Sequence, residues 1–159
     1  FPDLWEDYLA PIPVLERSRL IEAYHRRLTD PDPDVHRPAA LAWTTWEAST
    51  LTLLPDPELV GSMTEADAAV AFARIENHYF MHGGWFREGQ LIDALAAILR
   101  IPAVIGHVRS YPSPPSTAPR ALHPAPPDAE SVVVPDAGHA AGEPGIARAL
   151  RAATDRFGH

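Results

Sequence analysis

The spacing of apolar side chains divides this chain of 159 residues into two parts of different character. Over residues 1–100, apolar positions recur every three or four residues, a period that predicts amphipathic helices. We expect helices over 14–28, over 37–50, from Thr64 to Tyr79, and over 90–99. Thr64 begins a Thr-Glu-Ala-Asp stretch, which has the form of a capping box at a helix start.

After residue 101 the pattern changes to short runs of β-branched residues. The runs at 103–108 and 131–134 predict buried strands. Residues 110–127 between them are rich in proline, which removes backbone donors, so we expect an irregular excursion there. A helix should begin at Pro144 and continue to Phe157. Strand, excursion, strand and helix is the closing arrangement of an open α/β sheet, so the sequence predicts the α/β class.

Composition narrows the range of partners. The formal net charge is −8, with 13 basic against 21 acidic residues, and no stretch concentrates Lys or Arg, so we expect no nucleic-acid partner. The chain has no cysteine, which fits a cytoplasmic protein. No apolar run approaches the roughly 18 residues of a membrane span, so no membrane partner is expected. The chain begins Phe-Pro-Asp without an initiator Met, and we expect it to be a fragment.

One histidine stands where catalytic groups are common. His139 follows the predicted strand 131–134 through a Pro-Asp-Ala-Gly turn and precedes the last helix. Open α/β sheets place ligands and reacting groups at the carboxyl ends of their strands. A lone histidine in a turn is also often structural, so both interpretations stay open.

Two glutamates form a second candidate site. Glu76 lies four residues from both Phe72 and Phe80, so a carboxylate and two aromatic rings share one helix face. Glu47 directly follows Trp46. Acids among aromatic rings suit a cation with an apolar body, such as an amine on a ring. The alternative is two solvated charges on helix surfaces.

Two further patterns are weaker. His78 and His82 have the i, i+4 spacing of helical metal ligands, but no third ligand is evident, so we expect no metal and no cofactor. The His-Gly-Gly stretch at 82–84 resembles the oxyanion loop of lipases, yet here it ends a helix instead of following an early strand.

Several longer segments resemble one enzyme family. They are LIEAYHRRLTDPDP, AWTTWEASTLTLLPDP, AFARIENHYFMHGGWF and VVVPDAGHAAGEPGI, in this order. The chain resembles the C-terminal half of proline iminopeptidases (prolyl aminopeptidases), which are serine peptidases of the α/β-hydrolase fold. The resemblance implies a helical lid over 1–100, followed over 101–159 by the last strands, the histidine loop and the closing helix of the core. It also implies peptides with an N-terminal proline as substrates.

The resemblance assigns roles to four residues. His139 corresponds to the general base of the catalytic triad. Glu47 and Glu76 correspond to the glutamates that bind the free imino group of an N-terminal proline, and Phe80 to the aromatic residue that lines the pocket of its ring. These roles agree with the interpretation of two acids and aromatic rings as a site for a small cyclic cation.

The chain also departs from the family. None of its seven serines lies in the Gly-x-Ser-x-Gly stretch that carries the nucleophile. The ungapped match places Tyr111 where the family has its triad aspartate. We hypothesise a local reading-frame slip or decay within 109–127. This chain alone is therefore expected to be inactive unless the missing N-terminal half, its expected partner, completes it. The alternative is a non-catalytic remnant or binding module that keeps the amine pocket.

Overall fold

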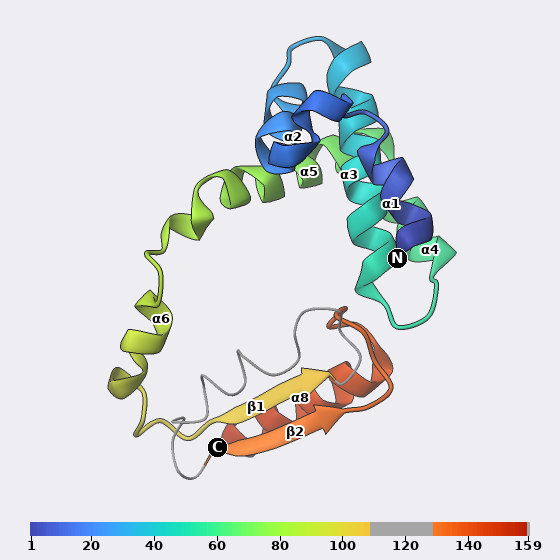
Figure 1. Ribbon diagram of the computed structural model, residues 1–159. Helices are drawn as coiled ribbons and strands as arrows, with labels where there is room; N and C mark the ends of the chain where they lie inside the picture. Colours follow the sequence, from blue (N-terminus) through green and yellow to red (C-terminus); the bar gives the residue numbers. More distant parts are fainter. Residues whose placement is uncertain (109–128, 159) are drawn as a thin grey trace. The chain divides into compact units, whose positions relative to one another are not determined.

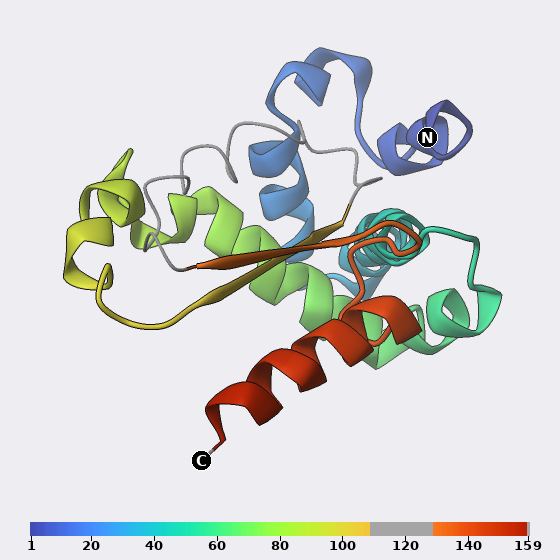
Figure 2. The ribbon, with the colours of Figure 1, turned by 90° about the horizontal axis from the view of Figure 1, so that it is seen from below.

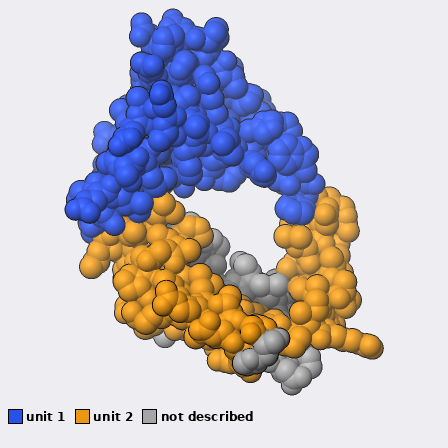
Figure 3. Space-filling view, turned by 180° about the vertical axis from the view of Figure 1, so that it is seen from behind, with its two compact units in different colours: residues 1–50, 55–86 blue, residues 51–54, 87–159 orange. Residues whose placement is uncertain are grey.

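A computed structural model describes residues 1–108 and 129–158. The expected irregular segment 110–127 lies outside the described residues, as does Tyr111. The chain forms two compact units, shown in different colours in Figure 3. Unit 1 contains Phe1–Thr50 and Pro55–Phe86, and unit 2 contains Leu51–Leu54 and Arg87–His159.

The regular secondary structure of unit 1 is all helical (Figure 1). Its elements are α1 (Pro2–Leu9), η1 (Val14–Arg19), α2 (Leu20–Leu28), α3 (Pro33–Leu51), α4 (Pro57–Met63), α5 (Ala66–Met81) and η2 (Gly83–Trp85), where η denotes a 3-10 helix. Proline in the first turn favours the start of α1 and α4, because its missing N–H would have no partner there. The Asp56 carboxylate caps α4 by accepting the Leu59 N–H at 2.9 Å.

Aromatic rings and small residues from several helices form the core of unit 1. Alanines let the helices approach closely around the large rings of Trp43 and Tyr24, which are 1% and 0% exposed. The Trp43 and Tyr24 ring centroids lie 5.1 Å apart, and Tyr8 stacks on Tyr24 at 4.9 Å. The buried members of this core are Tyr8, Leu9, Ile12, Ala23, Tyr24, Leu28, Ala39, Ala40, Trp43 and Ala73.

Two details of the helical prediction for unit 1 are wrong. The helix expected over 14–28 is split, because Arg19, the last residue of η1, adopts φ −138° and ψ 65°. The capping box at Thr64 does not form. The Thr64 hydroxyl donates to the Val60 carbonyl at 2.7 Å and so closes α4, while α5 begins after Glu65 without a side-chain cap.

Unit 2 contains a two-stranded sheet with a helix packed against it. Strands β1 (Val104–Val108) and β2 (Glu130–Val134) pair in parallel, from Val104 opposite Glu130 to Val108 opposite Val134. Helix α8 (Pro144–Phe157) packs against both strands (Figures 1 and 2). Both predicted strands, the predicted last helix and the α/β class are confirmed. The strands were expected to be buried, and this is wrong within the described residues: Val134 is the buried strand residue, and Val133 is 41% exposed. The helix expected over 90–99 is interrupted instead, with α6 (Gln90–Asp93) followed by η3 (Leu95–Ala97).

Within the ranges 1–108 and 129–158, no helix is both long and apolar enough to cross a membrane.

Candidate functional site: paired glutamates in unit 1 and a histidine loop in unit 2

The two candidate glutamates lie on neighbouring parts of unit 1, on α3 and α5. Trp43 precedes Glu47 by one helical turn on α3, and its indole Nε1–H donates to Oε2 of Glu76 at 2.7 Å. Trp43 itself is buried, so it holds the Glu76 carboxylate from inside the core. The sequence identified both glutamates as candidates but not the role of Trp43.

The electrostatics of unit 1 show that the two carboxyl groups influence each other. Burial, and to a lesser extent the negative charge of Glu76, together raise the pKa of Glu47 from 4.5 to about 7. Burial also raises the pKa of Glu76, while the hydrogen bond from Trp43 opposes that rise. The Tyr8 hydroxyl has its pKa raised by burial and then by the charges of Glu47 and Glu76. All three groups therefore share one poorly solvated region, in which at least one carboxyl group is readily protonated near neutral pH.

Aromatic rings surround this region and extend from the core to the surface. Phe80 lies on α5 one turn after Glu76, and its ring centroid is 5.9 Å from that of Trp43. The Tyr8 ring contacts Trp43 at 6.0 Å and Trp46 at 5.2 Å. Phe80 is 51% exposed, whereas Trp43 is 1% exposed. Carboxylates beside an accessible ring suit a ligand that combines a positive charge with an apolar ring.

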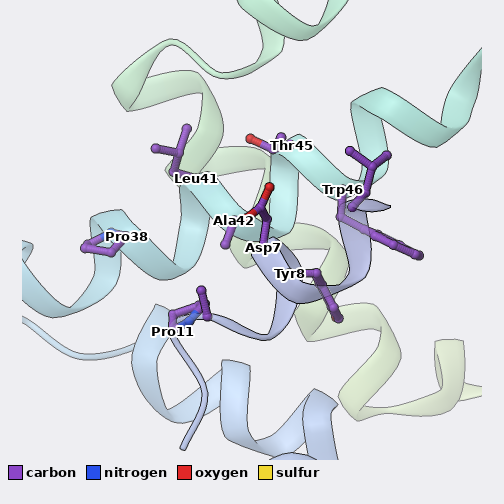
Figure 4. Close-up of a pocket in the computed structure, with 10 residues that line it drawn as sticks. Asp7, Tyr8, Pro11, Pro38, Leu41, Ala42, Thr45 and Trp46 are labelled. Atoms are coloured by element: carbon purple, nitrogen blue, oxygen red, sulfur yellow. The ribbon is translucent and has the colours of Figure 1, made fainter. Parts of the chain in front are cut away.

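A separate cavity of about 520 Å³ lies between α1 and α3 (Figure 4). Tyr8 and Trp46 contribute to its wall, but Glu47 and Glu76 do not. Its surface is mostly apolar, with Asp7 as the acidic group. The remaining lining residues are Leu4, Ala10, Pro11, Pro38, Leu41, Ala42 and Thr45. The sequence did not predict this cavity, because its walls come from two helices, and no motif in the sequence indicated that these helices lie against each other.

His139 lies in unit 2, on the loop between β2 and α8, as its place in the sequence predicted. The loop leaves the sheet at Val134, buries Ala137 and Gly138, and exposes His139. The backbone N–H groups of His139 and Ala140 both donate to the Leu51 carbonyl, at 2.6 and 3.0 Å. The histidine therefore stands on a backbone that is fixed within unit 2.

The histidines at the end of α5 form a stack of rings. The His78 and His82 centroids lie 4.5 Å apart, and His82 stacks on Trp85 at 4.9 Å. Gly83 and Gly84 have φ values of +55° and +59°, and they end α5 as the sequence indicated for the His-Gly-Gly stretch. No group of three or more potential metal-ligating side chains occurs among the residues that the structure describes.

Comparison with known proteins gives a consistent set of relatives. No family model matches the chain. The chain is 48% identical over 158 residues to a probable proline iminopeptidase of Leptolyngbya boryana, covering 99% of this chain and 49% of that protein. It is 46% identical to the proline iminopeptidase of Xanthomonas citri and 41% identical to that of Arabidopsis thaliana, covering 99% of this chain in both cases and 50% and 42% of those proteins.

The coverage of these relatives is as informative as the identity. The chain spans about half the length of the curated relatives that it matches, while nearly all of its own residues take part in the match. The expected family resemblance is therefore confirmed. The chain is related, from end to end, to about half of a proline iminopeptidase.

Proposed function

We propose that this chain is the amine-recognition lid and histidine-bearing end of a prolyl aminopeptidase with the α/β-hydrolase fold. Residues 1–100 would form the lid, and residues 101–159 would form the end of the core. The relatives support this assignment, since proteins named proline iminopeptidase match 99% of the chain. The parallel pair β1–β2 with α8 against it is the kind of unit that closes an α/β sheet.

The coupling of Glu47 and Glu76 is the observation that carries the proposed substrate. Two acidic groups with raised pKa values share a half-buried region, and neither forms an ion pair with a basic side chain among the described residues. A protonated imino group would supply the missing positive charge. The exposed face of Phe80 would contact the ring of an N-terminal proline.

This arrangement would reject peptides with a blocked N-terminus. An acyl group on the proline nitrogen removes the positive charge and the N–H donors. The half-buried carboxylates would then remain without a positive charge to pair with, which costs more free energy than a lost contact at the surface. The specificity would therefore come from desolvation as well as from attraction.

In the proposed reaction His139 is the general base. Its imidazole takes the proton from a serine hydroxyl as the serine attacks the carbonyl carbon of the N-terminal proline. The imidazolium then returns that proton to the leaving amine as the peptide bond breaks, and water later releases proline from the serine by the same proton transfers. The Gly-x-Ser-x-Gly serine is absent from this sequence, so the serine must come from the other half of the enzyme.

A second candidate function is binding without catalysis. It is favoured by the absence of the nucleophile motif from these 159 residues, while the glutamates and Phe80 are present. In that case the chain would still distinguish free N-terminal proline from the acylated form. The cytoplasmic location expected from the sequence stays a prediction.

The proposed amine site can be tested on the chain itself. The indole Nε1–H of Trp43 contacts Glu76, so its NMR signal reports on that carboxylate. Titration with L-prolinamide should shift this signal, whereas N-acetyl-L-prolinamide, which has no positive charge, should leave it in place. Glu76→Gln should abolish the response, and the exposed Glu88→Gln should preserve it. Equal responses to the two amides, or no response to either, would refute the amine site.

A further inference from the structure

The loop that carries His139 is tied to a distant segment of the chain by a set of backbone hydrogen bonds. Residues Leu51–Leu54 directly follow the unit 1 part of α3 in sequence, yet they belong to unit 2. The Leu51 carbonyl accepts the N–H groups of His139 and Ala140 at 2.6 and 3.0 Å. We call Leu51–Leu54 together with Gly138–Glu143 the histidine clasp.

One side chain closes the histidine clasp from the other side. Oε1 of Glu143 accepts the Gly138 N–H at 2.6 Å, and Oε2 of the same carboxylate accepts the Leu53 N–H at 3.4 Å. The two donors lie 85 residues apart in sequence, on the two halves of the clasp. A carboxylate is the side chain that offers two acceptor oxygens in this geometry, since an amide offers one oxygen and a second donor.

Gly138 allows the two halves to approach this closely. A Cβ atom at Gly138 would lie 2.5 Å from the Leu53 nitrogen and 2.7 Å from the Leu51 oxygen, which is too close for any side chain. By contrast, a Cβ atom at Gly142, in the same loop, would meet nothing within 4 Å. The close contact is therefore specific to the position just before the histidine.

From these contacts we propose that Glu143 is a positioning residue for His139: its carboxylate fixes the backbone that presents the imidazole by joining Gly138 to Leu53. Glu143 is the N-cap residue of α8, so the clasp also anchors the histidine loop to the start of that helix. The assignment of a catalytic task to His139 rests on the proposed function, whereas the clasp itself rests on the contacts of unit 2.

Hydrogen exchange measured by NMR on the chain tests the clasp without any catalytic assay. Because a charge-assisted bond is lost, Glu143→Gln should speed exchange of the Gly138, Leu53, His139 and Ala140 amide protons by at least about tenfold. Gly138→Ala should do the same by steric separation of the two halves. The matched variants Gly142→Ala and Glu88→Gln should leave these rates unchanged. The ring signals of His139 should broaden or shift in the first two variants alone.

Kinetics of a hybrid enzyme separate positioning from substrate binding. Residues 1–108 and 129–159 would replace the matching segments of one of the relatives, and the relative would keep its own segment between them, because Tyr111 stands where the family has its triad aspartate. Glu143→Gln should then lower kcat for a proline arylamide by about tenfold and leave KM within about twofold, because Glu143 is not one of the residues proposed to bind the imino group or the proline ring. Unchanged exchange in Glu143→Gln, or a rise in KM with constant kcat, would overturn the proposal. A hybrid that is inactive in every form, with faster loop exchange in Glu143→Gln, would instead refute the proposed function and leave the clasp intact.

Discussion

Replacing Glu47 by glutamine is expected to stabilise the protein at pH 8 but not at pH 4. Burial and the nearby charge of Glu76 raise the pKa of Glu47 to about 7 in the folded state, against an ordinary value of 4.5. The folded state therefore binds a proton more tightly than the unfolded state. The free energy of unfolding falls as the pH rises from 4.5 towards 7, and the full cost of the ionised carboxylate is present above pH 7.

The shift in the pKa of Glu47 sets the size of the expected gain in the free energy of unfolding. A rise from 4.5 to about 7 corresponds to a ceiling of about 3 kcal/mol at 1.36 kcal/mol per pH unit. Since the carboxyl group is only half-buried, solvent screening reduces the expected gain at pH 8 to about 1–2 kcal/mol. Below pH 4.5 the carboxyl group is protonated in both states, and glutamine, which is also neutral, should then bring almost no gain.

Urea unfolding followed by tryptophan fluorescence measures this difference at each pH. The buried Trp43 lies in the same helical unit and should report on its unfolding. Glu88→Gln, which alters an exposed carboxylate, serves as the control and should show no gain at either pH. If Glu47→Gln gave the same gain at pH 4 and pH 8, or no gain at pH 8, the carboxyl group would not be the desolvated acid described above.

Four other outcomes are expected. Trp43→Phe keeps an aromatic ring but removes the donor to Glu76, so it should raise the pKa of Glu76, measured by NMR titration of the carboxyl carbon. In the hybrid enzyme, Glu76→Gln should raise KM for a proline arylamide and lower kcat/KM. The lower kcat/KM should correspond to a loss of about 2–3 kcal/mol of transition-state stabilisation, because a charge-assisted contact is lost. Residues 1–159 alone should show no turnover of that arylamide and no labelling by a fluorophosphonate, since the nucleophile motif is absent. Gly145→Ala should destabilise unit 2 in thermal melts, because the new Cβ atom would lie 2.8 Å from a methyl group of Val134, whereas Gly142→Ala should not.

The sequence predicted the elements that periodicity and residue type determine locally. The β-branched runs gave both strands to within a residue, and Pro144 marked the first residue of α8. The predicted helix over 37–50 is found within the longer α3, which begins at Pro33.

Tertiary contacts determined the features that local patterns did not reveal. The capping box at Thr64 was wrong because Thr64 ends the preceding helix, where its hydroxyl donates to the Val60 carbonyl, and α5 begins only after Glu65. The bond from Trp43 to Glu76 joins residues 33 positions apart, and no local spacing indicates it. Trp43 could have been suspected only from its place one turn before Glu47. The histidine clasp joins positions that are still more distant, so the sequence showed His139 but not what fixes it.

The path of the chain between its two units limits how the chain can be cut into two pieces. The chain crosses between the units after Thr50, after Leu54 and after Phe86, so no single cut leaves both units complete. A truncation or a recombination event at Phe86 would keep α8 and both strands together but would remove Leu51–Leu54 from unit 2. The piece that begins at Arg87 would then carry His139 without the Leu51 carbonyl that holds its backbone. A piece of the chain therefore keeps the backbone contacts of the histidine loop only if it also contains the end of α3, the helix that bears Glu47.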